Sequence, residues 1–208
     1  MRLVNEGINN KLGGLNFAEC LIYSLNFGDI QDKGWENAYE LLFGACDSLK
    51  NAGVEAIAMC ANTAHLFADK LQTEIGLPFI HIGTETANVV RQKGLKTVGL
   101  LGTKLTMEMD FYRNKLEDNG VTVLVPQSLQ VRDYVQDTVK NELGKGFINE
   151  ETRQRYLLIA NELIDAGAEG IILGCTEIPM LISQADFSFP IFDTTKIHSD
   201  AIVKYMLS

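Results

Sequence analysis

A short pattern that occurs twice in the chain constrains its fold more than any other feature. Residues 52–63 align without a gap with residues 166–177, so that Ile57 matches Ile171. In both copies a glycine, the usual residue just past a helix C-terminus, precedes a short apolar run. Each copy therefore predicts the end of a helix, a buried strand and a loop at the carboxyl end of that strand. Two related halves of this kind predict an internally repeated α/β fold with a binding site in the cleft between them.

The second copy places a cysteine at its predicted strand end. Residues 169–173 predict a buried strand, and Gly174 and Cys175 follow it. Thr176 suits the N-cap of a further helix. Cys175 is therefore expected between a parallel strand and a helix, which is where α/β proteins bind ligands. A helix N-terminus at this point would favour the thiolate and lower the cysteine pKa from about 8.5 towards ~4–7.

The first copy differs at the same point, because Ala61 stands opposite Cys175 and Cys60 lies one position earlier. Neighbouring residues of a strand point to opposite faces. If Ala61 faces the cleft, Cys60 is expected to face the core, unless a local bulge turns its thiol towards the cleft. The repeat thus predicts one thiol base, from the second half, and leaves a catalytic role of Cys60 open.

Composition narrows the class of protein. The 208 residues suffice for one large or two small domains, and 46% apolar residues supply a core. A net charge of −9 disfavours nucleic acid and anionic membranes as partners. No apolar run approaches the ~20 residues of a membrane span, and no signal peptide is visible. The cysteines lack CxxC spacing, so we expect a cytoplasmic protein with reduced thiols, among them Cys46 as a core residue.

Apolar periodicity predicts alternating helices and strands. Helices are expected at residues 2–12, 35–51, 62–71, 84–93, 106–119, 130–143, 150–165 and 195–207. Strands are expected at residues 18–25, 54–60, 78–82, 96–101, 121–125, 169–173 and 190–192, with a polar loop at 26–34. Such alternation predicts parallel sheets with helices on both faces.

The repeat suggests two domains, residues 1–94 with 194–208, and residues 95–193. The second begins with a strand and a glycine turn, whereas the first begins directly with a helix. The first domain is therefore expected to lack its opening strand, either because the start codon truncates the chain or because this half is shorter. The turn at residues 102–103 is not GxGxxG and no GxxxxGK occurs, so no nucleotide cofactor is expected.

A set of segments together resembles the aspartate/glutamate racemase family, over essentially the whole chain. These segments are CANTAH at 60–65, LLGT at 100–103, GCTEIP at 174–179 and FDTTKIH at 192–198. The resemblance implies two pseudo-symmetric α/β domains, a homodimer and racemisation of a small amino acid without a cofactor. In this family two cysteines face each other across the substrate. One removes the α-proton, and the other delivers a proton to the opposite face.

The resemblance also implies roles for individual residues. Cys175 matches the second-domain cysteine, which acts on the L-enantiomer, and Glu177 would orient or reprotonate it or merely stabilise a first helical turn. The residues that match substrate-binding positions are Asn62, Thr63 and Thr176 for the α-carboxylate, Thr103 and Thr106 in the glycine-turn region, and Lys145 for the side-chain carboxylate. A thiolate suits the removal of a weakly acidic Cα–H, and several donors must hold the carboxylate beside the developing charge.

The histidines have no assigned part in this chemistry. His65 and His198 are each either structural hydrogen-bonding residues or catalytic groups. His81 lies too far along the sequence from either motif to give paired metal-ligand spacing, so no metal is expected.

The chain departs from the family pattern at several positions. Ala61 stands where the first catalytic cysteine is expected, and the Gly-Gly-Met turn of the opening strand is absent. Where some aspartate racemases use an arginine, the nearest polar residue is Gln31. We therefore expect an asymmetric racemase of aspartate or glutamate. Two alternatives stay open: an impaired or truncated member that binds a small dicarboxylate without efficient turnover, and a single-cysteine decarboxylase of the same superfamily.

Overall fold

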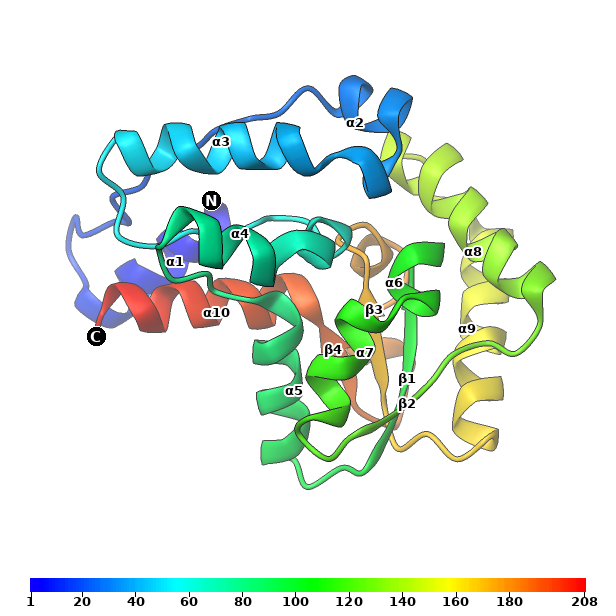
Figure 1. Cartoon of the computed structure of the whole chain (residues 1–208). Helices are drawn as coiled ribbons and strands as arrows, with labels where there is room; N and C mark the ends of the chain where they lie inside the picture. The colour runs from blue at the N-terminus through cyan, green and yellow to red at the C-terminus, as the bar shows by residue number, and fades with distance from the viewer. The chain divides into compact units, whose positions relative to one another are not determined.

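The chain forms two compact units in the computed structural model, which describes residues 1–208. The first unit comprises Met1–Ile82 with His198–Ser208, and the second comprises Gly83–Ile197 (Figure 1). Residues 83–94 and 194–197 thus belong to the second unit, whereas the division predicted from the sequence placed them in the first. None of the helices combines the length and the apolar character that a membrane crossing requires.

The second unit contains a four-stranded parallel sheet. Its strands are β1 (Thr97–Gly102), β2 (Thr122–Leu124), β3 (Ile171–Gly174) and β4 (Ile191–Asp193), in the order β2-β1-β3-β4. The helices of this unit are α5 (Ile82–Gln92), α6 (Lys104–Glu108), α7 (Asp110–Glu117), α8 (Leu129–Asn141) and α9 (Glu150–Asp165). Parallel strands need such helical crossovers, and in Figure 1 α8 and α9 lie on one side of the sheet and α5 and α7 on the other. The predicted α/β class is therefore confirmed.

The core of the second unit lies between the sheet and α9. Leu101, Ile171 and Leu173 are fully buried in it, together with Tyr156 of α9. The Tyr156 hydroxyl is 2.8 Å from Thr138 Oγ1, which satisfies both polar groups inside an apolar cluster. Burial of each such aliphatic side chain contributes roughly 1.5–3 kcal/mol, so this core fixes the ends of β1 and β3 firmly.

The first unit is mainly helical. Its helices are α1 (Arg2–Leu12), α2 (Phe27–Lys33), α3 (Tyr39–Asn51), α4 (Ala68–Ile75) and the major part of α10 (Thr194–Met206), with 3-10 turns at Trp35–Asn37 and Thr63–Phe67. A cluster around Leu42, Ile57 and Leu71 forms its core. Cys46 belongs to this cluster, as predicted, and burial raises the pKa of its thiol to about 11.

The two predicted strands of the first unit meet at a single parallel bridge, between Ile57 and Phe79. The Ile57 N–H donates to the Pro78 carbonyl over 2.9 Å. In the second unit the Ile171 N–H donates to the Pro190 carbonyl over the same distance. The isoleucines that the sequence repeat aligns therefore make the same parallel contact in the two units.

Several local predictions were wrong. Residues 18–25 have no regular secondary structure and pair with no strand, and Ile22 is 68% exposed, because an apolar segment makes a strand only where a neighbouring strand is available. Residues 26–34 are not a loop but contain α2, which the Asn26 side chain caps by accepting the Gly28 N–H at 3.2 Å. The helix expected at 106–119 is divided into α6 and α7 by the extended residue Met109.

Candidate functional site

The carboxyl ends of β1 and β3 bring two of the predicted site loops together within the second unit. Gly102 and Gly174, the last residues of these strands, are paired in register. A Cβ on Gly102 would lie 2.8 Å from the Gly174 carbonyl oxygen and 3.3 Å from Thr106 Cβ. The two strand ends therefore approach this closely only because both residues are glycines. Thr106 lies directly beside Gly174, the residue that precedes Cys175.

Cys175 is buried at the end of β3, with 6% of its surface exposed. Its Sγ–H donates to Glu177 Oε2 over 2.8 Å, and the Thr176 hydroxyl donates to the same oxygen over 2.8 Å. Burial raises the pKa of the Cys175 thiol well above its ordinary value, and the charge and the hydrogen bond of Glu177 raise it further. Cys175 is thus held as a neutral thiol whose proton points at a carboxylate.

This raised pKa corrects the prediction of a stabilised thiolate. No α-helix follows Cys175: the chain forms a single 3-10 turn at Ile178–Met180, and Thr176 is not its N-cap. One short turn has almost no macrodipole to favour an anion. The backbone N–H groups of Thr176 and Glu177 do lower the thiol pKa, but burial and the neighbouring carboxylate outweigh them.

The loop after β1 is fixed by its own hydrogen bonds. Thr103 is the N-cap of α6 and accepts the Thr106 N–H at 3.3 Å, and the two hydroxyl oxygens are 2.9 Å apart. The Lys104 N–H donates to Gln136 Oε1 over 2.8 Å, which ties the loop to α8. Thr103 is partly exposed and Thr106 is fully buried, so of these two hydroxyls that of Thr103 is the more accessible.

Thr194 is a residue of this sheet edge that the sequence analysis missed. Its hydroxyl donates to the Leu173 carbonyl over 2.7 Å and so joins the end of β4 to the end of β3. The preceding Asp193 accepts the Thr195 N–H at 3.0 Å and caps the start of α10. The signal was present in the segment FDTTKIH, whose consecutive Asp and Thr residues follow a short strand.

In the first unit, the predicted carboxylate-binding residues Asn62 and Thr63 are buried, with exposures of 3% and 4%. They lie at the start of the 3-10 turn Thr63–Phe67. The expectation that Cys60 faces the core is wrong, because Cys60 is exposed and Ala61 packs against the apolar cluster instead. The short isolated bridge does not enforce the side-chain alternation of a full strand over these positions.

His65 joins this loop to the first residue of α5, directly after the second segment of the bridge. Its Nδ1 lies 2.9 Å from the Ala61 carbonyl oxygen, and its Nε2 accepts the Ile82 N–H at 3.2 Å. Burial, with the nearby imidazoles of His81 and His198, lowers the His65 pKa well below its ordinary value. His81, which is distant in sequence, packs beside His65 with ring centroids 4.6 Å apart. Even so, no group of three or more His, Cys, Asp or Glu side chains has an arrangement that could hold a metal ion.

Two other predicted residues lie apart from these contacts. Lys145 is exposed in the 3-10 turn Leu143–Lys145, and no hydrogen bond or ion pair joins it to Cys175, Thr176 or Glu177. Gln31 is exposed on α2, not in the loop where the sequence placed it. Their roles in substrate binding stay predictions.

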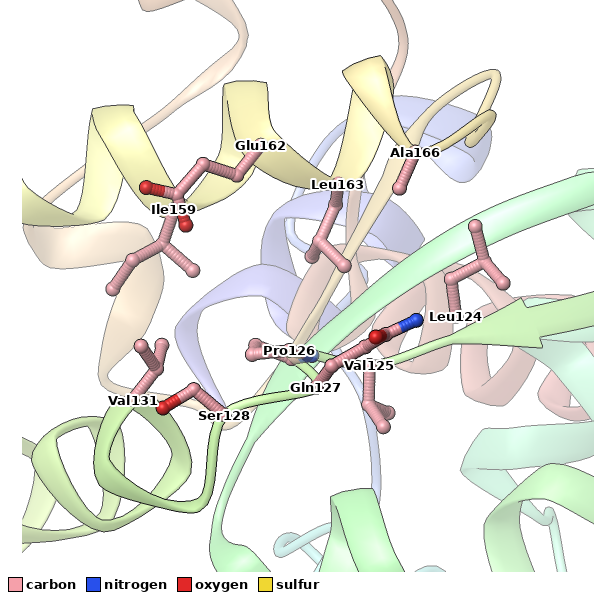
Figure 2. Close-up of a pocket in the computed structure, with 10 residues that line it drawn as sticks. All are labelled: Leu124, Val125, Pro126, Gln127, Ser128, Val131, Ile159, Glu162, Leu163 and Ala166. Carbon is pink, nitrogen blue, oxygen red and sulfur yellow. The ribbon is translucent and has the colours of Figure 1, made fainter.

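A separate cavity of about 280 Å³ lies in the second unit, between the segment from β2 to α8 and the side of α9 (Figure 2). Leu124, Pro126 and Leu163 contribute apolar walls, and Glu162 is its ionisable side chain. None of the predicted site residues lines this cavity.

Comparison with known proteins decides the family. The family model described as Asp/Glu/Hydantoin racemase matches residues 26–202. The chain belongs to the Asp/Glu/hydantoin racemase family. A crystal structure of an aspartate racemase homologue from Pyrococcus horikoshii is similar over 99% of the chain and 91% of its own, with 33% identity and a TM-score of 0.83. A crystal structure of a Yersinia pestis protein provisionally assigned to the Asp/Glu racemases is similar over 100% of the chain and 92% of its own chain, with 42% identity and a TM-score of 0.90.

Two curated relatives are longer than the chain. The broad specificity amino-acid racemase RacX of Bacillus subtilis is 26% identical over 77% of the chain and 68% of its own length. The glutamate racemase of Aquifex pyrophilus is 30% identical over 64% of the chain and 50% of its own length. The chain therefore spans about half the length of that glutamate racemase. The family and these relatives are amino-acid racemases.

Proposed function

We propose that the chain is a cofactor-independent racemase of an acidic amino acid, aspartate or glutamate, in which Cys175 is the base. The observation that carries this proposal is the Sγ–H of Cys175, which donates to Glu177 Oε2 over 2.8 Å at the carboxyl edge of a parallel sheet. Family membership and the named activities of relatives support the substrate class.

The contacts of Cys175 suggest how a buried thiol with a raised pKa becomes a base. The S–H bond breaks as Glu177 Oε2 takes the proton, which leaves a thiolate and a carboxylic acid. The thiolate then takes the α-proton of the L-amino acid, and the electron pair left on Cα delocalises into the α-carboxylate. Because Cys175 is buried, its thiolate would be weakly hydrated. A weakly hydrated thiolate is a stronger base than one exposed to water, and this favours abstraction of the α-proton.

Return of a proton to the opposite face requires a second donor. Ala61 has no exchangeable proton, so Cys60 or a water molecule would supply it, and we propose that racemisation is asymmetric. The developing charge on the substrate carboxylate needs fixed donors, and the proposed ones are the hydroxyls of Thr103 and Thr176 with Asn62 and Thr63 of the other loop. The homodimer and the cytoplasmic location expected from the sequence stay proposals.

A chiral assay tests this proposal. The purified chain is incubated separately with L-aspartate and L-glutamate, and the D-enantiomer is measured by chiral chromatography. We expect one of the two to racemise, and Cys175→Ser to abolish the reaction, while Cys20→Ser, a change at an exposed cysteine, leaves it intact. Activity that survives in Cys175→Ser would remove this thiol from the mechanism.

The single thiol favours one alternative reaction. A decarboxylase of this superfamily protonates a carbanion from one face and needs only one cysteine, which fits the presence of Ala61 opposite Cys175. Release of carbon dioxide from a malonate-type acid, without turnover of either amino acid, would support it. Binding of aspartate in a calorimeter without any turnover would instead indicate an impaired member of the family.

A further inference from the structure

We infer that His65 is a positioning residue for the loop that carries Asn62 and Thr63, and that it acts as a neutral imidazole with its proton on Nδ1. The inference rests on the proposed function only in that this loop binds the substrate carboxylate. The inference is supported by three observations: the hydrogen bonds of His65, its burial, and its place between the loop and the start of α5.

The partners of the ring determine its tautomer. Nδ1 lies 2.9 Å from the Ala61 carbonyl oxygen, which can only accept, so Nδ1 carries the proton. Nε2 lies 3.2 Å from the Ile82 backbone nitrogen, which can only donate, so Nε2 carries the lone pair. Both nitrogens are thus used by backbone groups, and no other protonation state of His65 satisfies both contacts.

These two bonds connect the carboxyl ends of two segments that otherwise share a single parallel bridge. The Ala61 carbonyl belongs to the peptide that leads into Asn62, and Ile82 is the first residue of α5, directly after the second segment of the bridge. Beyond the Ile57–Phe79 bridge the two segments form no further strand pairing. His65 therefore does what ladder hydrogen bonds do at the corresponding edge in the second unit, where β3 and β4 pair over several residues.

The surroundings of the ring keep it neutral. His65 is 2% exposed, and its ring centroid is 4.6 Å from that of His81 and 5.7 Å from that of His198. His198 Nε2 lies 2.7 Å from the Ile80 carbonyl oxygen, so that ring is also fixed by the backbone of the same segment. The titratable groups that act on His65 are these two imidazoles, and a proton on either would oppose a proton on His65.

Three substitutions separate the two bonds. His65→Asn can keep the donor to the Ala61 carbonyl, because its amide nitrogen occupies the place of Nδ1. His65→Gln can keep the acceptor for the Ile82 N–H, because its amide oxygen reaches the place of Nε2. His65→Leu removes both bonds and keeps an apolar side chain of similar size.

The experiment uses the full chain and has two readouts that do not depend on activity. Nitrogen chemical shifts of the labelled imidazole are expected to show the Nδ1–H tautomer. Because each lost hydrogen bond is worth about a fivefold change, amide hydrogen exchange at residues 62–63 is expected to accelerate about 25-fold in His65→Leu, which loses both bonds, and about fivefold in His65→Asn, which loses one. Val203→Ala, which opens a cavity in the separate apolar cluster of Val4, Ile8 and Val203, is the control and should leave this exchange unchanged.

Activity supplies the third readout. If the proposed racemase reaction occurs, His65→Leu is expected to raise KM for the amino acid about tenfold with kcat little changed, and His65→Asn is expected to restore KM. An Nε2–H tautomer, unchanged exchange in His65→Leu, or equal acceleration in the Val203→Ala control would overturn the inference. Absence of turnover in the wild-type chain would overturn the proposed function alone, because the tautomer and the exchange would still report on His65.

Discussion

Glu177→Gln is expected to lower the pKa of the Cys175 thiol, because the charge and the hydrogen bond of Glu177 both raise it. In the wild-type chain the thiol proton is shared with Glu177 Oε2 at 2.8 Å, and ionisation would place two anions side by side. At this 2.8 Å separation two like charges repel by at most about 6 kcal/mol at an effective dielectric constant of about 20. Removal of the carboxylate charge takes this repulsion away and so lowers the pKa of the thiol. Burial, the larger cause of the raised pKa, remains in the variant.

The assay is a titration of thiolate absorbance in the ultraviolet. The spectrum of the matching Cys175→Ser protein is subtracted from each spectrum, so that the thiolate absorbance of the other cysteines cancels. Glu177→Asp keeps the charge and should retain most of the raised pKa. Glu162→Gln changes an exposed carboxylate on α9 and should leave the titration of Cys175 at its wild-type midpoint. A midpoint that does not move in Glu177→Gln, or that rises, would refute the electrostatic account of this site.

Three further predictions concern stability. The pKa values of His65 and His198 in the folded chain lie below the unfolded value near 6.5, so the unfolded chain binds more protons below about pH 6.5. The free energy of unfolding should therefore fall as the pH drops below about 6.5, by about 1.4 kcal/mol per pH unit for each histidine. Denaturant titrations measure this slope, and the variant that combines His65→Leu with His198→Leu should lack it. Gly102→Ala should cost about 1–3 kcal/mol, because its Cβ would lie 2.8 Å from a backbone carbonyl of β3, whereas Gly44→Ala on α3 has open space and should not destabilise. Thr194→Val should cost about 1–3 kcal/mol by leaving a buried carbonyl without its 2.7 Å donor, and Thr194→Ser should recover most of the loss.

The sequence predicted best where helical periodicity and caps agree. The helix at residues 150–165 is confirmed as α9, which begins after the Asn149 cap and ends before Ala166. The strand before Cys175 is confirmed as β3 within two residues of its predicted start. Both elements depend on local pattern, and the packing of α9 on the sheet only reinforces that pattern.

The failed predictions have two kinds of cause, distant partners and local contacts that the sequence pattern did not show. Residues 18–25 have the composition of a strand, but pairing needs a neighbour that local pattern cannot supply. The predicted thiolate at Cys175 failed for a local reason, because the chain makes one 3-10 turn where a helix was expected and the carboxylate that accepts the thiol hydrogen bond is only two residues away. The grouping of three histidines could not be predicted because residues 65, 81 and 198 come together only through the tertiary fold.

Exchange of the substrate α-proton with solvent tests the central claim most directly. The chain is incubated in heavy water with L-aspartate or D-aspartate, and deuterium at Cα is followed by NMR. A single thiol base at Cys175 predicts faster exchange from the L-enantiomer than from the D-enantiomer, and no exchange in Cys175→Ser. Equal rates from both enantiomers, or exchange that persists without the Cys175 thiol, would contradict it.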